Sequence, residues 1–360
     1  MILTWIIFIL ILSVLILVHE FGHFIIAKKL GVRVEQFSLG FGKILFKKKK
    51  QDTEYSIGIM PLGGFVKLAG DNLDEYKGKP DEYYSQAPGR RFWIIFFGPL
   101  LNYILGFLLF WFIFFSGYPT LTTKVGGLID GFCAKAAGLE VGDKITAVDS
   151  KRVEYWEDLQ KLIQSDKSGS VKLAIIRKDK KITVDVKIKG KELQDSIGQK
   201  RNFNLIGIIP FDEIVIVRHG FLESVSLGFQ KTAQLTVMTY KALGYLITGK
   251  LSMRDSMSGP LGIFFITSKA AKLGMIAVLH LVAVLSLSLA IFNLLPLPIL
   301  DGGHILLLGL EKIRGKPLGI RSEQVINKIG ITFIMTLAIF VTYNDIVKHF
   351  GSQITKFFVK

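Results

Sequence analysis

The sequence predicts an α-helical polytopic membrane protein with about four transmembrane helices, a small β-rich region in its first loop and one inserted soluble-like domain. Half of the 360 residues are hydrophobic and the mean hydropathy is +0.44, which is too apolar for an ordinary water-soluble globule. Long apolar runs recur along the chain, and about 20 such residues suffice to cross a bilayer. The net charge of +16 gathers beside these runs, as at residues 47–50, which suits an anionic membrane surface.

Four stretches are predicted as membrane helices because they are long and apolar: residues 2–27, 92–116, 275–295 and 329–343. The first contains His19, Glu20 and His23 as its strongly polar side chains. It lacks both the basic start and the small-residue cleavage site of a secretory signal, so it is predicted to be retained. The fourth is the shortest.

The loops between these helices predict their orientation. Residues 28–91 and the loop after the third helix are rich in Lys and Arg, so both are expected to face the cytoplasm. The long middle segment is then expected to lie on the outer side of the membrane. No basic stripe interleaved with aromatic residues is present, which argues against a nucleic-acid partner and leaves the lipid bilayer to account for the charge. The single cysteine, Cys133, excludes an intrachain disulfide.

The loops also carry patterns of their own. In the first loop, residues 32–68 predict strands, because apolar and small residues alternate around Ile57. In the middle segment, the sequence predicts strands at residues 171–177 and 182–188 and an amphipathic helix at residues 156–164. The polar residues 191–204 predict a linker.

Residues 221–247 are apolar but are interrupted by Glu223, Lys231 and Lys241. An interfacial amphipathic helix is favoured over a fifth span, which would disturb the predicted orientation. The chain is accordingly divided into four regions: a first membrane half (1–116), a soluble-like domain (117–200), a linker with the interfacial helix (201–274) and a second membrane half (275–360).

His19-Glu20-Phe21-Gly22-His23 forms the H-E-x-x-H pattern. On a helix, positions i and i+4 share a face, so both imidazoles can bind one Zn²⁺ with Glu20 beside them as general base. The alternative is polar contact between packed helices. Ionisable groups inside an apolar helix are costly, and this favours the metal site.

A catalytic zinc site needs a third protein ligand and leaves one position for water. That ligand must come from the cytoplasmic side of the membrane, where Asp301 and His304 follow the third predicted helix. They end the segment Asn293-Leu-Leu-Pro-Leu-Pro-Ile-Leu-Asp301-Gly-Gly-His304, in which two prolines interrupt the helix. Irregular backbone at membrane depth is tolerated where it lines a cavity or is buried in protein. Asp301 is favoured and His304 is the alternative.

These motifs together resemble the site-2 protease family, and in particular its bacterial RseP-type branch that contains PDZ domains. The resemblance rests on the H-E-x-x-H pattern, on the segment ending in Asp301, and on four further segments: Gly98-Pro-Leu-Leu-Asn102, Pro61-Leu-Gly-Gly-Phe-Val-Lys67, Ala136-Ala-Gly-Leu-Glu-Val-Gly-Asp-Lys-Ile145 and Ser258-Gly-Pro-Leu-Gly-Ile263. The resemblance covers nearly the whole chain. Only one Gly-Asp-x-Ile signature is found, whereas some relatives carry two tandem PDZ domains.

The resemblance implies a membrane-associated β-hairpin in the first loop and an extracytoplasmic α/β PDZ domain at residues 117–200. It implies a zinc metalloendopeptidase that acts on membrane-protein substrates, such as anti-sigma-factor-like proteins or signal-peptide remnants. Asp301 is then the third zinc ligand, Asn293 contacts substrate, and Gly63 and Gly64 of the hairpin are expected to do the same. Two other classes stay open, an inactive zinc-binding scaffold and an ion transporter. The intact Glu20 argues against the scaffold, and the lack of paired inverted halves argues against the transporter.

Overall fold

The computed structural model describes residues 2–194, 200–316 and 319–358. It divides into two compact units. The helical unit comprises Met1–Ile113, Val225–Leu243 and Met257–Lys360, and the strand-rich unit comprises Phe114–Ser224 and Gly244–Ser256. Each unit is described by itself.

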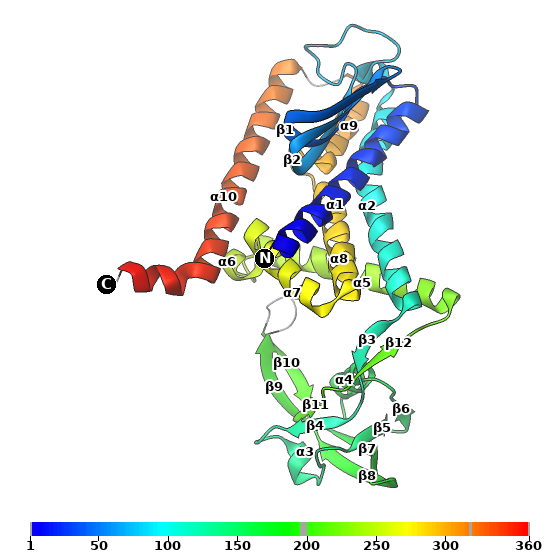
Figure 1. Ribbon diagram of the computed structural model, residues 1–360, viewed down its shortest axis with the longest axis vertical. Helices are drawn as coiled ribbons and strands as arrows, with labels where there is room; N and C mark the ends of the chain where they lie inside the picture. Colours follow the sequence, from blue (N-terminus) through cyan, green and yellow to red (C-terminus); the bar gives the residue numbers. More distant parts are fainter. Residues whose placement is uncertain (1, 195–199, 317–318, 359–360) are drawn as a thin grey trace. The chain divides into compact units, whose positions relative to one another are not determined.

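Four helices in the described residues are long and apolar enough to cross a membrane, as predicted: α1 (Ile2–Lys29), α2 (Pro88–Ser116), α8 (Met275–Asn293) and α10 (Ile320–Phe358). They are the long coils of Figure 1. Many of their apolar side chains are exposed, which is expected of surfaces that face lipid. The predicted bounds of the fourth span were too short, because its apolar part extends over Gln324–Lys348 and includes buried Asn344 and Asp345.

Glycines allow the first two helices to approach closely. A Cβ added at Gly22 in α1 would lie 2.2 Å from the Phe97 carbonyl oxygen in α2. Further along α2, a Cβ at Gly106 would lie 2.7 Å from Leu287 of α8. Small residues bring membrane helices into close backbone contact in this way.

The first loop folds into β1 (Val34–Lys50) and β2 (Thr53–Leu68), which confirms the predicted strands. Both strands bend, so that the first half of β1 pairs with both ends of β2. The resulting order of segments is 44–50, 53–58, 34–41 and 64–68. Figure 1 shows this sheet beside α1 and α9 (Asp301–Arg314). The 64–68 segment is an outer edge of the sheet.

A further helix of this unit meets α10. Between α6 (Met253–Ser256) and α8, α7 (Pro260–Leu273) begins against the buried Asp345 carboxylate. Its Oδ2 accepts the backbone N–H groups of Gly259 at 3.0 Å and Gly262 at 2.8 Å. A carboxylate at this position satisfies orphan donors and complements the helix dipole.

The predicted helix at residues 221–247 is present as α5 (Phe221–Ile247). It is not among the four helices that are apolar enough to cross a membrane. Within the helical unit it touches α2, where Tyr103 Oη lies 3.0 Å from Thr236 Oγ1. Its position at the membrane interface stays a prediction.

The strand-rich unit contains a four-stranded antiparallel sheet in the order β6-β5-β7-β8. The strands and helices of this unit are β3 (Tyr118–Leu121), β4 (Val125–Leu128), α3 (Cys133–Ala136), β5 (Lys144–Val148), β6 (Lys151–Arg152), α4 (Trp156–Ser165), β7 (Ser170–Arg177), β8 (Lys180–Lys187), β9 (Lys189–Gln194), β10 (Lys200–Leu205), β11 (Ile208–Pro210) and β12 (Ile214–Val217). The short helix η1 (Tyr83–Ser85) belongs to the first loop of the helical unit. The predicted helix and two strands are confirmed as α4, β7 and β8. Leu159 of α4 and Leu173 of β7 belong to one buried apolar core.

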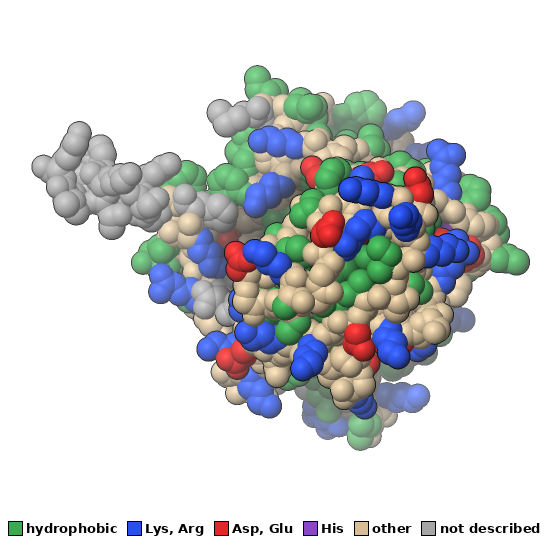
Figure 2. Space-filling model, turned by 90° about the horizontal axis from the view of Figure 1, so that it is seen from below, with side chains coloured by type: hydrophobic (Ala, Val, Ile, Leu, Met, Phe, Trp, Pro, Cys, Tyr) green, Lys and Arg blue, Asp and Glu red, His purple; other side chains and the backbone are tan. Residues whose placement is uncertain are grey.

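The linker predicted at residues 191–204 is wrong. β9 and β10 pair as an antiparallel hairpin, and residues 195–199 between them lie outside the described part. β11 and β12 then pair with β4 and β3, so the start of the predicted 201–274 linker is also structured. Polar residues obscured these strands because both faces of the hairpin are largely exposed. Figure 2 shows a face of the molecule on which Lys and Arg side chains alternate with Asp and Glu and form no single basic patch on that face.

Candidate metal centre

Helix α1 carries the H-E-x-x-H residues in its C-terminal half. His19 and His23 lie one turn apart, and their Nε2 atoms are 3.2 Å from each other. The rings are edge to face, with centroids 4.8 Å apart. Two imidazole nitrogens therefore converge on one point, as the i, i+4 spacing predicts.

Close packing of α2 fixes His23. A Cβ at Gly98 would lie 2.3 Å from the His23 ring, so only glycine leaves room for the imidazole. His23 Nδ1 lies 2.8 Å from the carbonyl oxygen of Ile94. This contact makes Nδ1 the protonated nitrogen and leaves Nε2 free to bind a metal.

Asp301 is the first residue of α9 and follows an irregular connection from α8. In this connection Ile299 has a φ of 79°, and a Cβ at Gly302 would lie 2.3 Å from the Leu294 carbonyl oxygen. The folded-back chain places the Asp301 carboxylate against both imidazoles. Its oxygens lie 3.1 Å from His19 Nε2 and 3.6 Å from His23 Nε2.

These distances fit a shared metal ion. Tetrahedral zinc with bonds of about 2.0–2.1 Å holds its ligand atoms about 3.3 Å apart. The two imidazole nitrogens lie 3.2 Å apart, and the two oxygens of Asp301 lie 3.1 and 3.6 Å from them, close to this spacing. One ligand atom from each residue lies within 4.8 Å of the others. Two imidazoles and one carboxylate are also a donor set typical of catalytic zinc.

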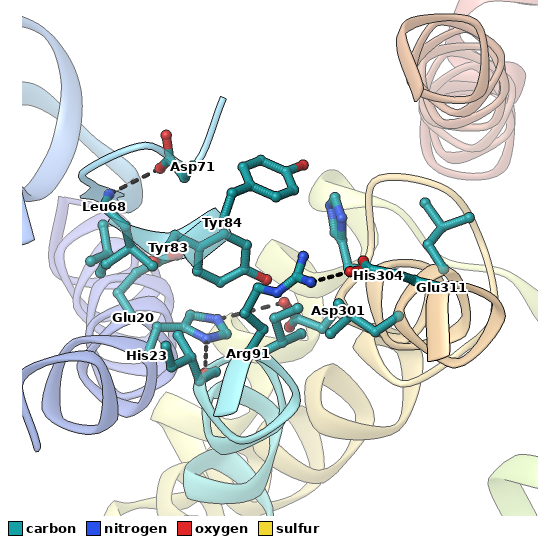
Figure 3. A pocket seen from close by; sticks show the side chains of 15 residues that line it. Glu20, His23, Leu68, Asp71, Tyr83, Tyr84, Arg91, Asp301, His304 and Glu311 are labelled. Carbon is teal, nitrogen blue, oxygen red and sulfur yellow. Dashed lines mark hydrogen bonds and ion pairs between the residues drawn. The ribbon is translucent and has the colours of Figure 1, made fainter. Parts of the chain in front are cut away.

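Glu20 points into the same space. Its side chain lies beside Gly64 of β2, where an added Cβ would be 3.4 Å from Glu20 Cγ, and its carboxylate faces the backbone N–H of Val66. A cavity of about 310 Å³ opens beside Glu20, His23 and Asp301. The general base is therefore placed between the metal ligands, the edge of the sheet and a space large enough for substrate atoms (Figure 3).

The far wall of the cavity was not predicted from the sequence. Buried Arg91, near the start of α2, forms an ion pair with Glu311 of α9 and lies over the rings of Tyr83 and Tyr84. Asp71 also lines the cavity, accepts the Leu68 N–H at 2.9 Å, and has its pKa raised by burial. The sequence signal was weak, since one Arg at the start of an apolar helix reads as an ordinary cytoplasmic flank. The Arg91–Glu311 pair ties α2 to the helix that carries Asp301.

The other candidate residues take different places. His304 lines the cavity, but the residue brought to the imidazoles is Asp301. Asn293 is the half-buried last residue of α8 and is not among the residues that line the cavity. Gly63 has a φ of 154°, and a Cβ there would collide with the Phe41 ring. The structure gives Gly63 and Gly64 packing reasons, and their contact with substrate stays a prediction.

Comparison with known proteins gives matches along nearly the whole chain. The model of peptidase family M50 matches residues 7–337. Among the relatives are the zinc metalloprotease RasP of Geobacillus kaustophilus, 31% identical over 95% of this chain and 97% of its own, and the regulator of sigma-W protease RasP of Bacillus subtilis, 28% identical over 96% and 99%. The regulator of sigma E protease of Haemophilus influenzae is 27% identical over 95% and 98%. Among solved structures, the PDZ domain of an SdrC-like protein from Listeria monocytogenes is 24% identical over 26% of this chain and 87% of its own, with a TM-score of 0.19.

Proposed function

Because the chain belongs to peptidase family M50, we propose that it hydrolyses peptide bonds within or near transmembrane segments, with zinc held by His19, His23 and Asp301. It is a zinc metalloendopeptidase of the site-2 protease type, as its relatives are named zinc metalloproteases. The observation that carries the residue assignment is the convergence of three metal-binding side chains, with one ligand atom from each within 4.8 Å of the others, beside a glutamate.

The residues of the chain divide the chemistry among them. When bound, zinc supplies a Lewis acid for the scissile carbonyl and an acidified water. The Glu20 carboxylate accepts the proton of the attacking water and returns it to the leaving amine. The Val66 N–H beside this carboxylate restrains its orientation. Arg91 and Glu311 hold α9 against α2, which keeps Asp301 at the imidazoles.

Replacing Glu20 with Gln tests this assignment. Glu20→Gln keeps the size of the side chain but removes the base, so cleavage of a candidate membrane substrate should fall by about 10²–10⁴-fold. Zinc stoichiometry should stay at one per chain. His19→Ala is the comparison, because it should lose both cleavage and zinc. An inactive scaffold or a transporter would show no cleavage even in the wild-type protein.

A transmembrane substrate must unwind before water can reach its carbonyl groups, because a helix uses them in its own hydrogen bonds. The 64–68 segment of β2 offers an extended edge next to Glu20, and strands can be added to such an edge. Phe65→Pro should therefore reduce turnover while zinc stays bound. Leu45→Pro, in the opposite edge segment 44–50, is the matched control and should have a smaller effect. Equal turnover in the two variants and the wild type would refute edge pairing.

The relatives suggest the class of substrate and the cellular context. The Haemophilus and Bacillus subtilis proteins are named as regulators of sigma E and sigma-W, so membrane-bound anti-sigma-like proteins are proposed as substrates, with signal-peptide remnants as the alternative. The Lys- and Arg-rich first loop supports an active site toward the cytoplasm of a bacterial inner membrane. A protease-accessibility assay on oriented vesicles would test this orientation.

The strand-rich unit is proposed as an extracytoplasmic PDZ domain that binds chain ends or screens substrate size. The Gly-Asp-x-Ile signature and the packing of α4 on an antiparallel sheet support this proposal. The proposed boundaries of residues 117–200 need extension, because β10, β11 and β12 pair within the same unit. Deletion of the unit should alter which substrates are cut more than it alters zinc binding.

A further inference from the structure

The two proposed zinc-binding histidines differ at their second ring nitrogen. His23 Nδ1 has the Ile94 carbonyl as its acceptor, whereas His19 Nδ1 is buried and has no hydrogen-bond partner among the described residues. Both Nε2 atoms face Asp301, so binding of zinc there leaves each Nδ1 protonated. A buried N–H that lacks an acceptor destabilises the folded state, because its hydration is lost and not replaced. The site therefore requires an acceptor for His19.

Asn102 in α2 is the complementary group. It is fully buried, and neither its Oδ1 nor its Nδ2 has a partner within the part of the chain that the structure describes. A side-chain amide in this state is exceptional, because buried polar groups in proteins are nearly always hydrogen-bonded. The cost is greater at membrane depth, where bulk water is absent.

The helix register brings the two unpaired groups into the same region. Gly98 and Asn102 are one turn apart on one face of α2, and a Cβ at Gly98 would lie 3.1 Å from His19 Cε1, the ring carbon between Nδ1 and Nε2. His23 of α1 contacts Ile94 and Gly98 of α2. The two helices run in opposite directions, so His19, one turn before His23, lies toward the next turn of α2, which carries Asn102. Ser286 of α8 donates to the backbone carbonyl oxygen of Asn102 at 2.7 Å, so α8 borders α2 at this level.

We propose that Asn102 is a positioning residue for the metal centre. One buried water molecule accepts a hydrogen bond from the protonated His19 Nδ1 and donates one to the Asn102 amide oxygen, and so holds the tautomer that presents Nε2 to zinc. A buried water typically makes about three hydrogen bonds, which this polar pair of residues can supply. The inference rests on the proposed zinc site and assigns a role to the last residue of the Gly98-Pro-Leu-Leu-Asn102 segment.

Zinc affinity of the full-length protein tests the proposal by competition with a chromophoric chelator. Asn102→Leu keeps the approximate volume but removes the acceptor, and zinc should bind about 10–100-fold more weakly. Asn102→Asp retains an acceptor for His19 and should restore most of the affinity. Ser286→Ala is the matched control, because it removes a buried hydrogen bond to the same residue but leaves the amide, and its zinc affinity should stay near that of the wild type.

Thermal unfolding of the zinc-free protein separates positioning from a structural role. The zinc-free Asn102→Leu variant should unfold at or above the wild-type temperature, because an unpaired buried amide has been replaced by an apolar side chain. Unchanged zinc affinity in Asn102→Leu would overturn the proposal, as would an equal loss of stability with and without zinc. A wild-type protein that binds no zinc would instead refute the proposed function.

Discussion

Asp143 in the strand-rich unit and Asp301 in the helical unit are both carboxylates held away from solvent, but their partners differ. Asp143 accepts two hydrogen bonds of 2.7 Å from Arg177 and one of 2.9 Å from the Glu140 N–H. Asp301 faces two imidazole nitrogens that can bind the same cation as the carboxylate. The oxygens of Asp143 are thus satisfied by hydrogen-bond donors, whereas those of Asp301 face nitrogen atoms that can themselves bind a cation.

This difference separates stability from function. A buried carboxylate whose oxygens are all paired contributes to folding and needs nothing further. Acceptors that converge without donors are stable only when a cation joins them. The Gly-Asp-x-Ile signature around Asp143 is therefore a structural element of its domain, while His19, His23 and Asp301 form the proposed metal site.

Gly98→Ala should show the largest effect on the metal centre. The added methyl group would lie 2.3 Å from the His23 ring, so the imidazole must move away from His19 and Asp301. We expect zinc affinity to fall by at least about 100-fold, which exceeds the loss typical when a residue that only orients a metal ligand is replaced. Equilibrium dialysis measures this, with Gly89→Ala as the control on the same helix, because a Cβ there meets nothing within 4 Å. Equal zinc binding by the two variants would contradict the geometry described.

Asp143→Ala should act on stability and leave the metal centre intact. Removing one partner of a buried ion pair typically costs 3–5 kcal/mol, and we expect about 3 kcal/mol in the unfolding of the strand-rich unit because Arg177 is partly exposed. Denaturant unfolding followed by the fluorescence of Trp156 measures it. Asp130→Ala, which breaks an exposed pair with Lys135, should leave unfolding unchanged. A loss of zinc in Asp143→Ala would contradict the separation of the two roles.

Acid should weaken the same domain by a smaller amount. Burial acts to raise the pKa of Asp143, but the hydrogen bonds from Arg177 and the Glu140 N–H outweigh it and hold the pKa below its usual value. The stabilisation is therefore complete above the unfolded-state pKa of about 3.9 and is lost as pH falls through the lower folded-state value. Unfolding measured between pH 7 and pH 3 should show wild type and Asp143→Asn converging below about pH 4. A constant difference across this range would count against the pKa shift.

The sequence predicted much of the fold because each membrane helix and several of the strands carry a local pattern of apolar and polar residues. Four apolar runs, the alternation around Ile57 and the amphipathic stretch before Ser165 required no knowledge of the rest of the chain. The β9–β10 hairpin was missed because both of its faces are exposed, so its strands lack the alternation that burial imposes. The extent of α10 was underestimated because Asp345 interrupts its apolar pattern. This carboxylate is stabilised by hydrogen bonds from Gly259 and Gly262 at the start of α7, which lie more than 80 residues earlier in the sequence.

The site was predicted in part for a similar reason. His19, Glu20 and His23 are close in sequence, and helix geometry alone places them together. Asp301 could be selected by membrane depth and by the broken helix before it. Arg91, Glu311 and Asn102 were not predicted to act there, because their roles depend on partners on other helices. An isolated Arg or Asn in an apolar helix has many explanations until its neighbours in space are known.

The contact between Asp345 and the start of α7 has a consequence for biosynthesis. When α7 leaves the ribosome, its first N–H groups have no carboxylate to receive them, since Asp345 follows about 80 residues later in the chain. The early helices can enter the bilayer one by one, and α7 can pack against α1 and α8 once these have been made, but its first N–H groups gain the Asp345 carboxylate only after α10 has been translated. In a chain stalled on the ribosome before residue 345, the first turn of α7 should therefore lack its cap, and cross-linking of such arrested chains near Gly259 would report when the cap forms.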